Sequence, residues 1–209
     1  IIYPNEYIDS KEKIQEILAQ FEKISLKKLP KSYRKWTRMD KSKYSKMVSK
    51  MQFYKLKKRN VYQKIVGNTR IKDVIARDSF YRRSNWFSDE ELFLGIDPRI
   101  LFKILALQDE LTKKDFDRNA IWIRYGHRHP RLNEAVNGAS KSHHIAGEAV
   151  DMVIRDINKD GKYTDEDKQI VMDLCEKKII KNFGGLGKYP GTRTVHIDVR
   201  GYRARWDTY

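Results

Sequence analysis

The sequence predicts an α+β fold, in which a basic, mainly helical N-terminal region precedes a small antiparallel sheet with flanking helices. Three observations support this prediction. Apolar residues recur at helical spacing in several segments, short segments in the second half have the composition of strands, and positive charge is concentrated in the first half. Of the 209 residues, 40% are hydrophobic and 11% are aromatic, which is sufficient for a packed core.

The net charge of +16 is distributed unevenly along the chain. Residues 1–85 hold 23 Lys and Arg against 8 Asp and Glu, whereas residues 86–209 hold 21 against 20. We therefore predict two regions, a basic helical N-terminal region over residues 1–85 and a second domain over residues 86–209.

Two stretches of the N-terminal region have the apolar spacing of amphipathic helices. Asp9 and Glu12 have the pattern of a capping box for a helix over residues 10–25. A second helix is predicted by one apolar stripe, which consists of Tyr44, Met47, Val48, Met51 and Tyr54.

Lysines and arginines dominate the segment from Lys23 to Arg59, with 15 basic residues against the single acid Asp40. Aromatic residues such as Trp36 are interleaved with these cations. Cations attract a polyanion and aromatic faces supply stacking, so the segment suits an anionic partner. The alternative is an ordinary helical subdomain with a solvated basic face.

The sequence of the second region predicts helices and strands in mixed order. Ser88 with Glu91 has the pattern of another capping box, and Asp97 followed by Pro98 begins a helix that continues to about residue 111. Strands are predicted over 120–126 and 148–154 and at the start of 194–206, with helices over 130–136 and 165–180.

Several classes of protein are excluded or disfavoured by simple features. No apolar run approaches the ~20 residues that a membrane helix needs. The single cysteine, Cys175, excludes an intrachain disulfide and a multi-thiolate zinc site. The chain begins at Ile1 with neither an initiator methionine nor a signal peptide, so we expect a processed or trimmed protein.

Histidines and aspartates in two separate segments suggest a metal site. His144 and Asp151 flank Gly147 in the stretch SHHIAGEAVD, and strand alternation in VHIDV places His196 and Asp198 on one face. A catalytic zinc site needs three protein ligands and an open position for water. These residues could supply the three ligands.

The order of several motifs is similar to that of a known family. The blocks are Tyr125-Gly126-His127-Arg128 with Pro130, Asn133, Asn137, Gly138, Ala139, Ser142, His144, Gly147, Ala149 and Asp151, then GGLGKYP (184–190), VHIDVR (195–200) and Arg205-Trp206. Over about residues 88–206 the chain resembles the zinc D-alanyl-D-alanine carboxypeptidases and endopeptidases that trim bacterial peptidoglycan, a group related to the hedgehog signalling fold.

The resemblance implies a role for each matching residue. It implies zinc bound by His144, Asp151 and His196, with Arg128 orienting the substrate carbonyl or carboxylate and steadying the developing oxyanion. The substrate-binding residues that it implies are Arg128, Ser142, His143 and Tyr189. It also implies a peptidoglycan substrate and a periplasmic or secreted location.

The proton acceptor departs from the pattern of the family. Some members have a glutamate three residues, or a histidine two residues, before the third ligand, where this chain has Arg193 and Thr194. Asp198 is the nearest candidate, either as the catalytic base or as a support for His196. His143 and His127 are the next candidates.

An acidic ladder follows the second predicted strand and has the spacing of a calcium loop. Oxygen donors fall at alternate positions and a glycine stands at the sixth, which suits a hard cation with six to eight oxygen ligands. The predicted ligands are Asp156, Asn158, Asp160, the carbonyl of Lys162, Thr164 and Asp167. A solvated acidic turn is the alternative.

We therefore predict a zinc peptidase that cuts peptidoglycan stem peptides next to D-amino acids, with a structural calcium ion. The basic N-terminal region would bind an anionic cell-wall polymer. A phage-type lysin that cuts the L-alanyl-D-glutamate bond and a non-catalytic, zinc-stabilised wall-binding protein are the alternatives. Nucleic-acid binding rests only on the basic aromatic segment and is the weakest of the hypotheses.

Overall fold

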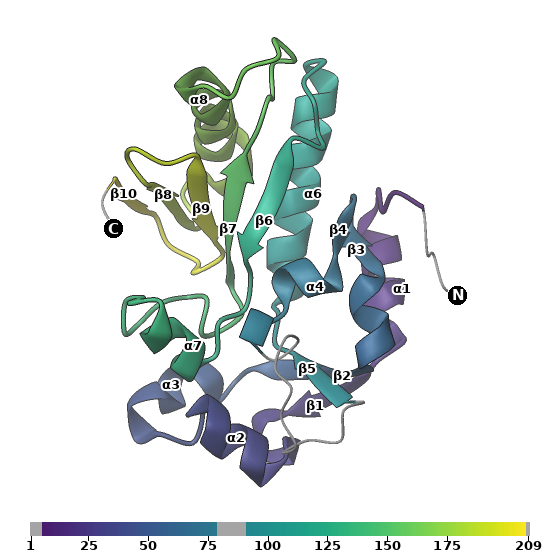
Figure 1. Cartoon of the computed structure of the whole chain (residues 1–209), viewed down its shortest axis with the longest axis vertical. Helices are drawn as coiled ribbons and strands as arrows, with labels where there is room; N and C mark the ends of the chain where they lie inside the picture. The colour runs from purple at the N-terminus through teal and green to yellow at the C-terminus, as the bar shows by residue number, and fades with distance from the viewer. Residues whose placement is uncertain (1–5, 79–90, 208–209) are drawn as a thin grey trace.

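The computed structural model describes residues 6–78 and 91–207 and shows an elongated molecule (Figure 1). A five-stranded sheet with helix α8 occupies one end, and helices α2 and α3 lie at the other end. Small, mostly antiparallel sheets combine with helices, so the predicted α+β fold class is confirmed.

The five-stranded sheet carries the strands of the second region in the order β10-β8-β9-β7-β6. Neighbouring strands are antiparallel, except that β10 runs parallel to β8. The strands are β6 (Ile121–Tyr125), β7 (Ala149–Ile154), β8 (Gly185–Lys188), β9 (Thr194–Asp198) and β10 (Ala204–Trp206).

One face of this sheet is apolar and the other carries polar side chains. Val150, Met152, Val195 and Ile197 belong to the main core cluster, which also includes residues of α6 and α8. Alternation along β7 and β9 then points the residues between them to the opposite face. The helices of this region are α6 (Pro98–Lys113), α7 (Pro130–Ala135) and α8 (Asp165–Leu174), and α8 continues into a π-helical segment (Cys175–Ile180).

The N-terminal region contains strands as well as helices. Strand β2 pairs with β1 on one side and with β5 (Glu91–Leu94), from the second region, on the other. The remaining elements are α1 (Lys11–Ala19), β1 (Glu22–Ser25), α2 (Lys31–Thr37), α3 (Ser45–Val48), β2 (Gln52–Lys57), β3 (Lys64–Val66), β4 (Thr69–Arg70), α4 (Ile71–Val74) and 3₁₀ segments at Leu26–Lys28, Ser42–Tyr44 and Lys58–Tyr62.

Two helix predictions in this region are wrong in part. Helix α1 ends at Ala19, six residues before the expected end at 25, and Ser10 rather than Asp9 caps it through a 3.2 Å hydrogen bond from the Lys13 amide. The helix predicted over 44–54 stops at Val48, because residues 52–57 form β2.

Burial on both faces of β2 explains the second error. Phe53 enters one hydrophobic cluster, whereas Tyr54 and Leu56 enter the other, so the apolar residues do not alternate as in a half-buried strand. The proposed capping box at Ser88 lies outside the described residues, and Glu91 begins β5.

The two predicted regions share their hydrophobic cores. Ile14 and Ile17 of α1 belong to the same cluster as Ile100 and Ile104 of α6. A second cluster, which we call the lower cluster, contains Ile24, Leu29, Tyr33, Met39, Tyr44, Val48, Met51, Phe53, Phe93 and Ile145. The predicted boundary at residues 85 and 86 lies outside the described residues, and the division into two regions stays a prediction. No helix among the described residues is long and apolar enough to cross a membrane.

Candidate metal centre

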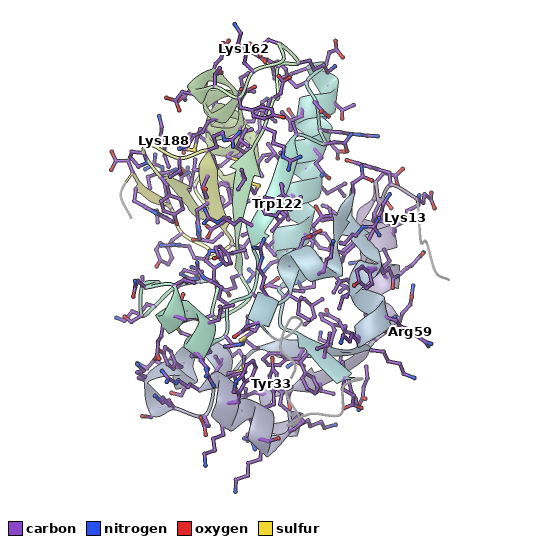
Figure 2. All side chains as sticks on the ribbon, in the orientation of Figure 1. Lys13, Tyr33, Arg59, Trp122, Lys162 and Lys188 are labelled. Carbon is purple, nitrogen blue, oxygen red and sulfur yellow. The ribbon has the colours of Figure 1, made fainter. Side chains whose placement is uncertain are left out.

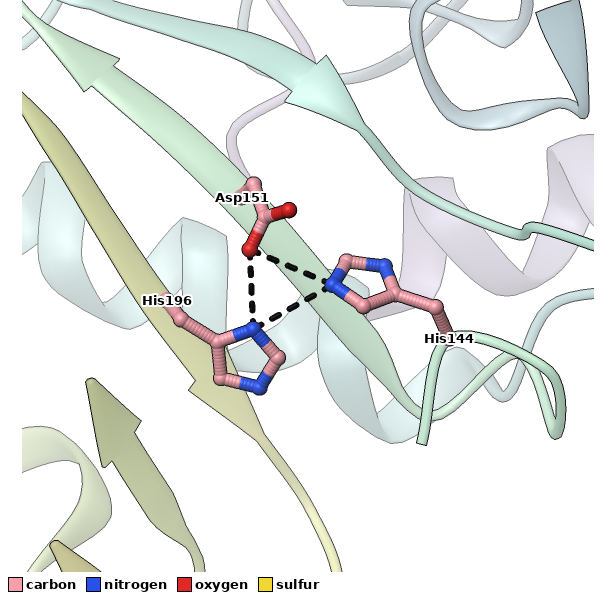
Figure 3. Close-up of side chains that lie close together, drawn as sticks. All are labelled: His144, Asp151 and His196. Carbon is pink, nitrogen blue, oxygen red and sulfur yellow. Dashed lines mark hydrogen bonds and ion pairs between the residues drawn. The ribbon is translucent and has the colours of Figure 1, made fainter. Parts of the chain in front are cut away.

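Three buried side chains converge on the polar face of the five-stranded sheet. His196 lies opposite Asp151 in the pairing of β9 with β7, and His144 comes from the loop before β7 (Figure 3). Nδ1 of His196 is 2.8 Å from Oδ1 of Asp151, and Nε2 of His144 is 3.2 Å from both atoms. None of the three residues is more than 5% exposed.

Hydrogen bonds on the outer edges of both imidazoles free the inner nitrogens to bind a metal. Nδ1 of His144 donates to the carbonyl oxygen of Gly126 at 2.7 Å, which leaves the lone pair on Nε2. Nε2 of His196 donates to the carboxylate of Asp198 at 3.2 Å, which leaves the lone pair on Nδ1.

The spacing of the three donor atoms fits a zinc ion. Tetrahedral ligands that lie ~2.0–2.1 Å from zinc are roughly 3.3 Å from one another. The separations of 2.8–3.2 Å between the donor atoms of His144, Asp151 and His196 are close to that value. Among the described residues, these three form the only group of three or more His, Cys, Asp or Glu side chains whose ligand atoms all lie within 4.8 Å of one another.

Burial and mutual contacts also set the charge of each donor. Burial lowers the pKa of His144 despite the neighbouring Asp151, which keeps that imidazole neutral. Burial opposes ionisation of Asp151, but contacts with the two histidines outweigh it and hold the carboxyl pKa well below its usual range. Burial likewise acts against the charged form of His196, yet hydrogen bonds with Asp151 and Asp198 raise its pKa. A proton and a metal ion therefore compete for this last site.

The N-terminal half of the fold holds the loop that carries His144. The neighbouring Ile145 is fully buried in the lower cluster. Gly147 has a φ of +71°, and a Cβ there would lie 2.4 Å from the carbonyl oxygen of Gly95, so only glycine permits this close approach. The amide of Asp97 donates to the carbonyl of Gly147 at 2.9 Å.

Helix α7 is attached to the same half of the molecule through Glu134. The Tyr44 hydroxyl donates to Oε1 of Glu134 at 2.6 Å, Lys43 donates to the same oxygen at 3.0 Å, and Arg38 contacts the other oxygen. The hydrogen bonds from Tyr44 and Lys43 lower the pKa of Glu134 to about 2. These contacts fix α7, which begins two residues after Arg128.

A cleft of about 730 Å³ opens over the three donor atoms, so a fourth coordination position would face the cleft. The residues that the sequence analysis assigned to substrate binding all line this cleft, namely Arg128, Ser142, His143 and Tyr189.

Arg128 lies deep in the cleft beside the metal-binding triad. Its Nη2 donates to Oγ of Ser142 at 3.3 Å, and its Nη1 is 3.5 Å from Oδ2 of Asp151. Burial lowers the pKa of Arg128, although Asp151 opposes this shift. A buried guanidinium next to a metal site can bind a carbonyl oxygen or a carboxylate of a substrate.

A profile of the peptidase M15 family matches residues 90–198, which include all three metal-binding residues. The chain belongs to the peptidase M15 family. No curated protein and no solved structure matches the chain. The M15 peptidases are zinc peptidases of the D-Ala-D-Ala carboxypeptidase type that act on peptidoglycan, and the His-Asp-His triad is compatible with this family.

Asp198 lies behind the triad of this M15 peptidase rather than in its cleft. Its carboxylate is fully buried and accepts hydrogen bonds from His196, from the amide of Gly185 at 2.8 Å and from Nε of Arg200 at 2.9 Å. Burial acts against ionisation, but contacts with His196 and Arg200 hold the pKa of Asp198 far below its usual range. Of the two roles considered for Asp198, this geometry favours support of His196 over proton acceptance.

The two other histidines considered as proton acceptors have different surroundings. His143 lines the cleft, and its Nδ1 donates to the carboxylate of Glu148 at 2.7 Å. His127 is 1% exposed and packs against Phe53, and no side chain of the described residues makes a hydrogen bond to its ring nitrogens. Burial lowers the pKa of His127 to about 3, so this residue is a neutral part of the core.

The predicted calcium loop lies between β7 and α8, at the opposite end of the M15 peptidase from Tyr33 (Figure 2, Lys162). Its carboxylates bind backbone amides of the loop. Asp156 accepts from Asp160 at 3.0 Å and from Gly161 at 2.9 Å, and Asp167 accepts from Thr164 at 2.8 Å. Gly161 has a φ of +82°, as the predicted sharp turn requires. The loop is thus ordered by its own hydrogen bonds, and a calcium ion there stays a prediction.

Three groups at the site were given no role in the sequence analysis. They are the Gly126 carbonyl, Glu148 and the ring of Trp206, which lies 5.0 Å from the His196 ring and lines the cleft. Backbone carbonyls carry no signal in the sequence. The usable signal for Trp206 was the motif block Arg205-Trp206, and the structure explains Gly187, where a Cβ would lie 2.6 Å from the indole.

Proposed function

We propose that this M15 peptidase hydrolyses amide bonds next to D-amino acids in peptidoglycan stem peptides or crosslinks, as a DD-carboxypeptidase or endopeptidase. One observation carries the proposal: the three donor atoms of the metal centre line a cleft in which the buried guanidinium of Arg128 lies beside Asp151. A peptide carbonyl held by Arg128 would then lie next to the metal.

Each residue of the cleft has a separate role in the proposed reaction. A bound zinc ion would supply an acidified water and polarise the scissile carbonyl. Arg128, steadied by Ser142, orients the carbonyl or a neighbouring carboxylate and stabilises the negative charge that develops on oxygen. Tyr189 forms another part of the cleft wall.

Proton transfer is assigned to His143 on the basis of position. Asp151 is the only Asp or Glu among the described residues that line the cleft, and it is a metal ligand. His143 lines the cleft with Nδ1 bound to Glu148, so its Nε2 carries a lone pair. We assign Asp198 to the orientation of His196, through the hydrogen bond to Nε2.

The products of digestion test the proposal. Zinc-loaded protein and the His196→Ala variant are incubated with purified muropeptides, and the products are identified by mass spectrometry. Loss of terminal D-alanine marks a carboxypeptidase, and monomers released from dimers mark an endopeptidase. Cleavage between L-alanine and D-glutamate would instead identify the lysin activity. Products identical to those of His196→Ala would leave only the wall-binding role.

We also propose that the protein acts outside the cytoplasm, in the periplasm or after secretion, and that it binds an anionic cell-wall polymer through the N-terminal region. Exposed lysines without an ion-pair partner among the described residues lie on and near α2 and α3, at positions Lys31, Lys35, Lys41 and Lys46.

Neutralisation of these four lysines tests the polymer proposal. Glutamine at all four positions should weaken sedimentation with isolated cell walls, and added salt should weaken wild-type binding. The matched control replaces four exposed lysines elsewhere, Lys114, Lys162, Lys178 and Lys181, which removes the same charge. Equal losses of cell-wall binding in both variants would show that binding depends on net charge alone.

A structural calcium ion in the loop from Asp156 to Asp167 is a further part of the proposal. It rests on the spacing of the oxygen donors and on the turn at Gly161. The ion would attach β7, which carries Asp151, to the start of α8.

A further inference from the structure

Three arginines surround the ring of Tyr125 at the end of β6. The guanidinium carbons of Arg77, Arg124 and Arg128 lie 5.3, 5.7 and 5.4 Å from the centre of this ring. Arg77 also lies 5.3 Å from the ring centre of Trp122, which is labelled on β6 in Figure 2. We call Arg77, Arg124 and Arg128 the arginine cluster.

Among the described residues, the arginine cluster makes a single ion pair, between Arg128 and Asp151. Arg77 and Arg124 form no ion pair with any carboxylate of the described residues. The nearest carboxylate to Arg128 belongs to Asp151, at 3.5 Å, and that group is committed to the metal centre. Three like charges around one ring repel one another unless an anion binds between them.

The cleft as a whole also has more basic than acidic side chains among the described residues. Residues 86–209 contain nearly equal numbers of basic and acidic residues, 21 against 20. Four of these basic residues line the cleft, but Asp151 is the only acid of the described part of the chain that does so. The excess of cations in the cleft is therefore a local feature and does not follow from the +16 charge of the chain.

We propose that Arg77 and Arg124 of the arginine cluster form a binding subsite for a free carboxylate of the substrate, next to the group held by Arg128. This inference rests on the proposed peptidase function, because the ligand is the same peptide whose amide is cut. A guanidinium binds a carboxylate through two parallel hydrogen bonds, and the aromatic faces of Trp122 and Tyr125 hold Arg77 in place.

Continuity with the cleft favours a peptide carboxylate over a phosphate of a wall polymer. Arg124 and Arg128 line the same cavity as the metal-binding triad, so an anion bound between them belongs to the molecule that occupies the cleft. The exposed lysines of the N-terminal region, by contrast, are not among the residues that line this cavity.

A matched pair of peptides tests the subsite. One is a stem peptide with free side carboxylates, and the other is the same peptide with those carboxylates converted to carboxamides. Calorimetric titration and steady-state kinetics are carried out with wild type, Arg124→Gln, Arg77→Gln and the control Arg155→Gln, an exposed arginine outside the cleft.

We expect wild type and the control to bind the free acid about tenfold more tightly than the amide, as one charge-assisted contact would give. In Arg124→Gln and Arg77→Gln the ratio of the two affinities should approach one. The KM for the free acid should rise, and kcat should stay unchanged. Amidated peptide should behave alike in all four proteins.

Each outcome separates the subsite from the proposed function. Equal binding and equal turnover of the two peptides by wild type would overturn the subsite and leave the function intact. A preference in binding that Arg124→Gln abolishes, without turnover of either peptide, would support the subsite and overturn the function. Loss of wall-polymer binding in Arg124→Gln, with the peptide preference unchanged, would assign the cluster to the polymer and overturn the proposal.

Discussion

The carboxylate of Asp198 lies 3.2 Å from Nε2 of His196, on the edge of the ring opposite the nitrogen that faces Asp151. Asp198 also binds Arg200 and the amide of Gly185, so its oxygens are committed to groups behind the metal centre. This arrangement fixes the orientation of a metal-binding imidazole.

The first prediction follows from this contact. Asp198→Asn keeps the shape of the side chain but removes the charge that holds His196, so zinc affinity should fall about 10–100-fold. Competition with a zinc chelator measures the affinity. Unchanged affinity combined with lost turnover would return Asp198 to the role of proton acceptor.

The second prediction concerns His143. His143→Ala should retain zinc but lower kcat by about 10²–10⁴-fold, the usual contribution of a positioned proton acceptor. Glu148→Gln should give a smaller loss, because it removes the negative charge of the group that binds Nδ1 but keeps an oxygen that can accept the hydrogen bond. A near-normal kcat in His143→Ala would exclude the assignment.

The third prediction tests how the N-terminal half positions His144. Ile145→Ala and Ile24→Ala remove the same atoms from the lower cluster and should each lower the free energy of unfolding by ~2–5 kcal/mol. Only Ile145→Ala should also weaken zinc binding, because Ile145 adjoins the ligand. Urea denaturation and chelator competition measure the two effects. Equal zinc affinity in both variants would contradict this positioning role.

The fourth prediction concerns acid stability. The pKa of His127 is about 3 in the folded chain because of burial, against about 6.5 in the unfolded chain. Unfolding therefore takes up a proton below pH 6.5, and the contribution of His127 to stability, complete above that pH, is lost as the pH falls toward 3. Between pH 7 and pH 5 it should account for about 2 kcal/mol.

His127→Leu isolates this contribution, because leucine has no proton to gain. The free energy of unfolding should fall less steeply from pH 7 to pH 5 in the variant than in wild type, as measured by urea denaturation at each pH. Parallel curves would show that His127 does not control acid stability.

The fifth prediction concerns calcium. Calcium should raise the melting temperature of wild type but not of Asp160→Ala, which loses one oxygen donor at the centre of the loop. Asp40→Ala, an exposed acid of the N-terminal region and outside the loop, is the control and should respond as wild type does. Equal shifts in wild type and Asp160→Ala would favour a solvated acidic turn.

Local patterns in the sequence were sufficient to predict some helices and strands and insufficient to predict others. The cap and proline at Asp97 and Pro98 identified α6, because those residues specify a helix start regardless of what packs around it. The strand β2 was missed, because its apolar residues face two different clusters and its partners, β1 and β5, are distant in sequence.

The candidate site likewise contains residues that the sequence identified and contacts that it could not predict. His144, Asp151 and His196 were identified because the ordered motifs around them resemble those of a zinc peptidase family, and the structure brings the three side chains together. The surroundings of Asp198 could not be deduced, because strand alternation places it on the same face as His196 but does not say which edge of the ring it contacts.

The lower cluster has a practical consequence for the production of shortened forms of this chain. The part that matches the family, residues 90–198, contains the His-Asp-His triad but lacks the N-terminal residues that cover Phe93 and Ile145 and the strand that pairs with β5. A recombinant fragment cut at the edge of the family match would expose apolar side chains and a bare strand edge to water, and it should aggregate. A fragment that folds on its own should therefore begin upstream of the family match, so that it includes the N-terminal residues of the lower cluster.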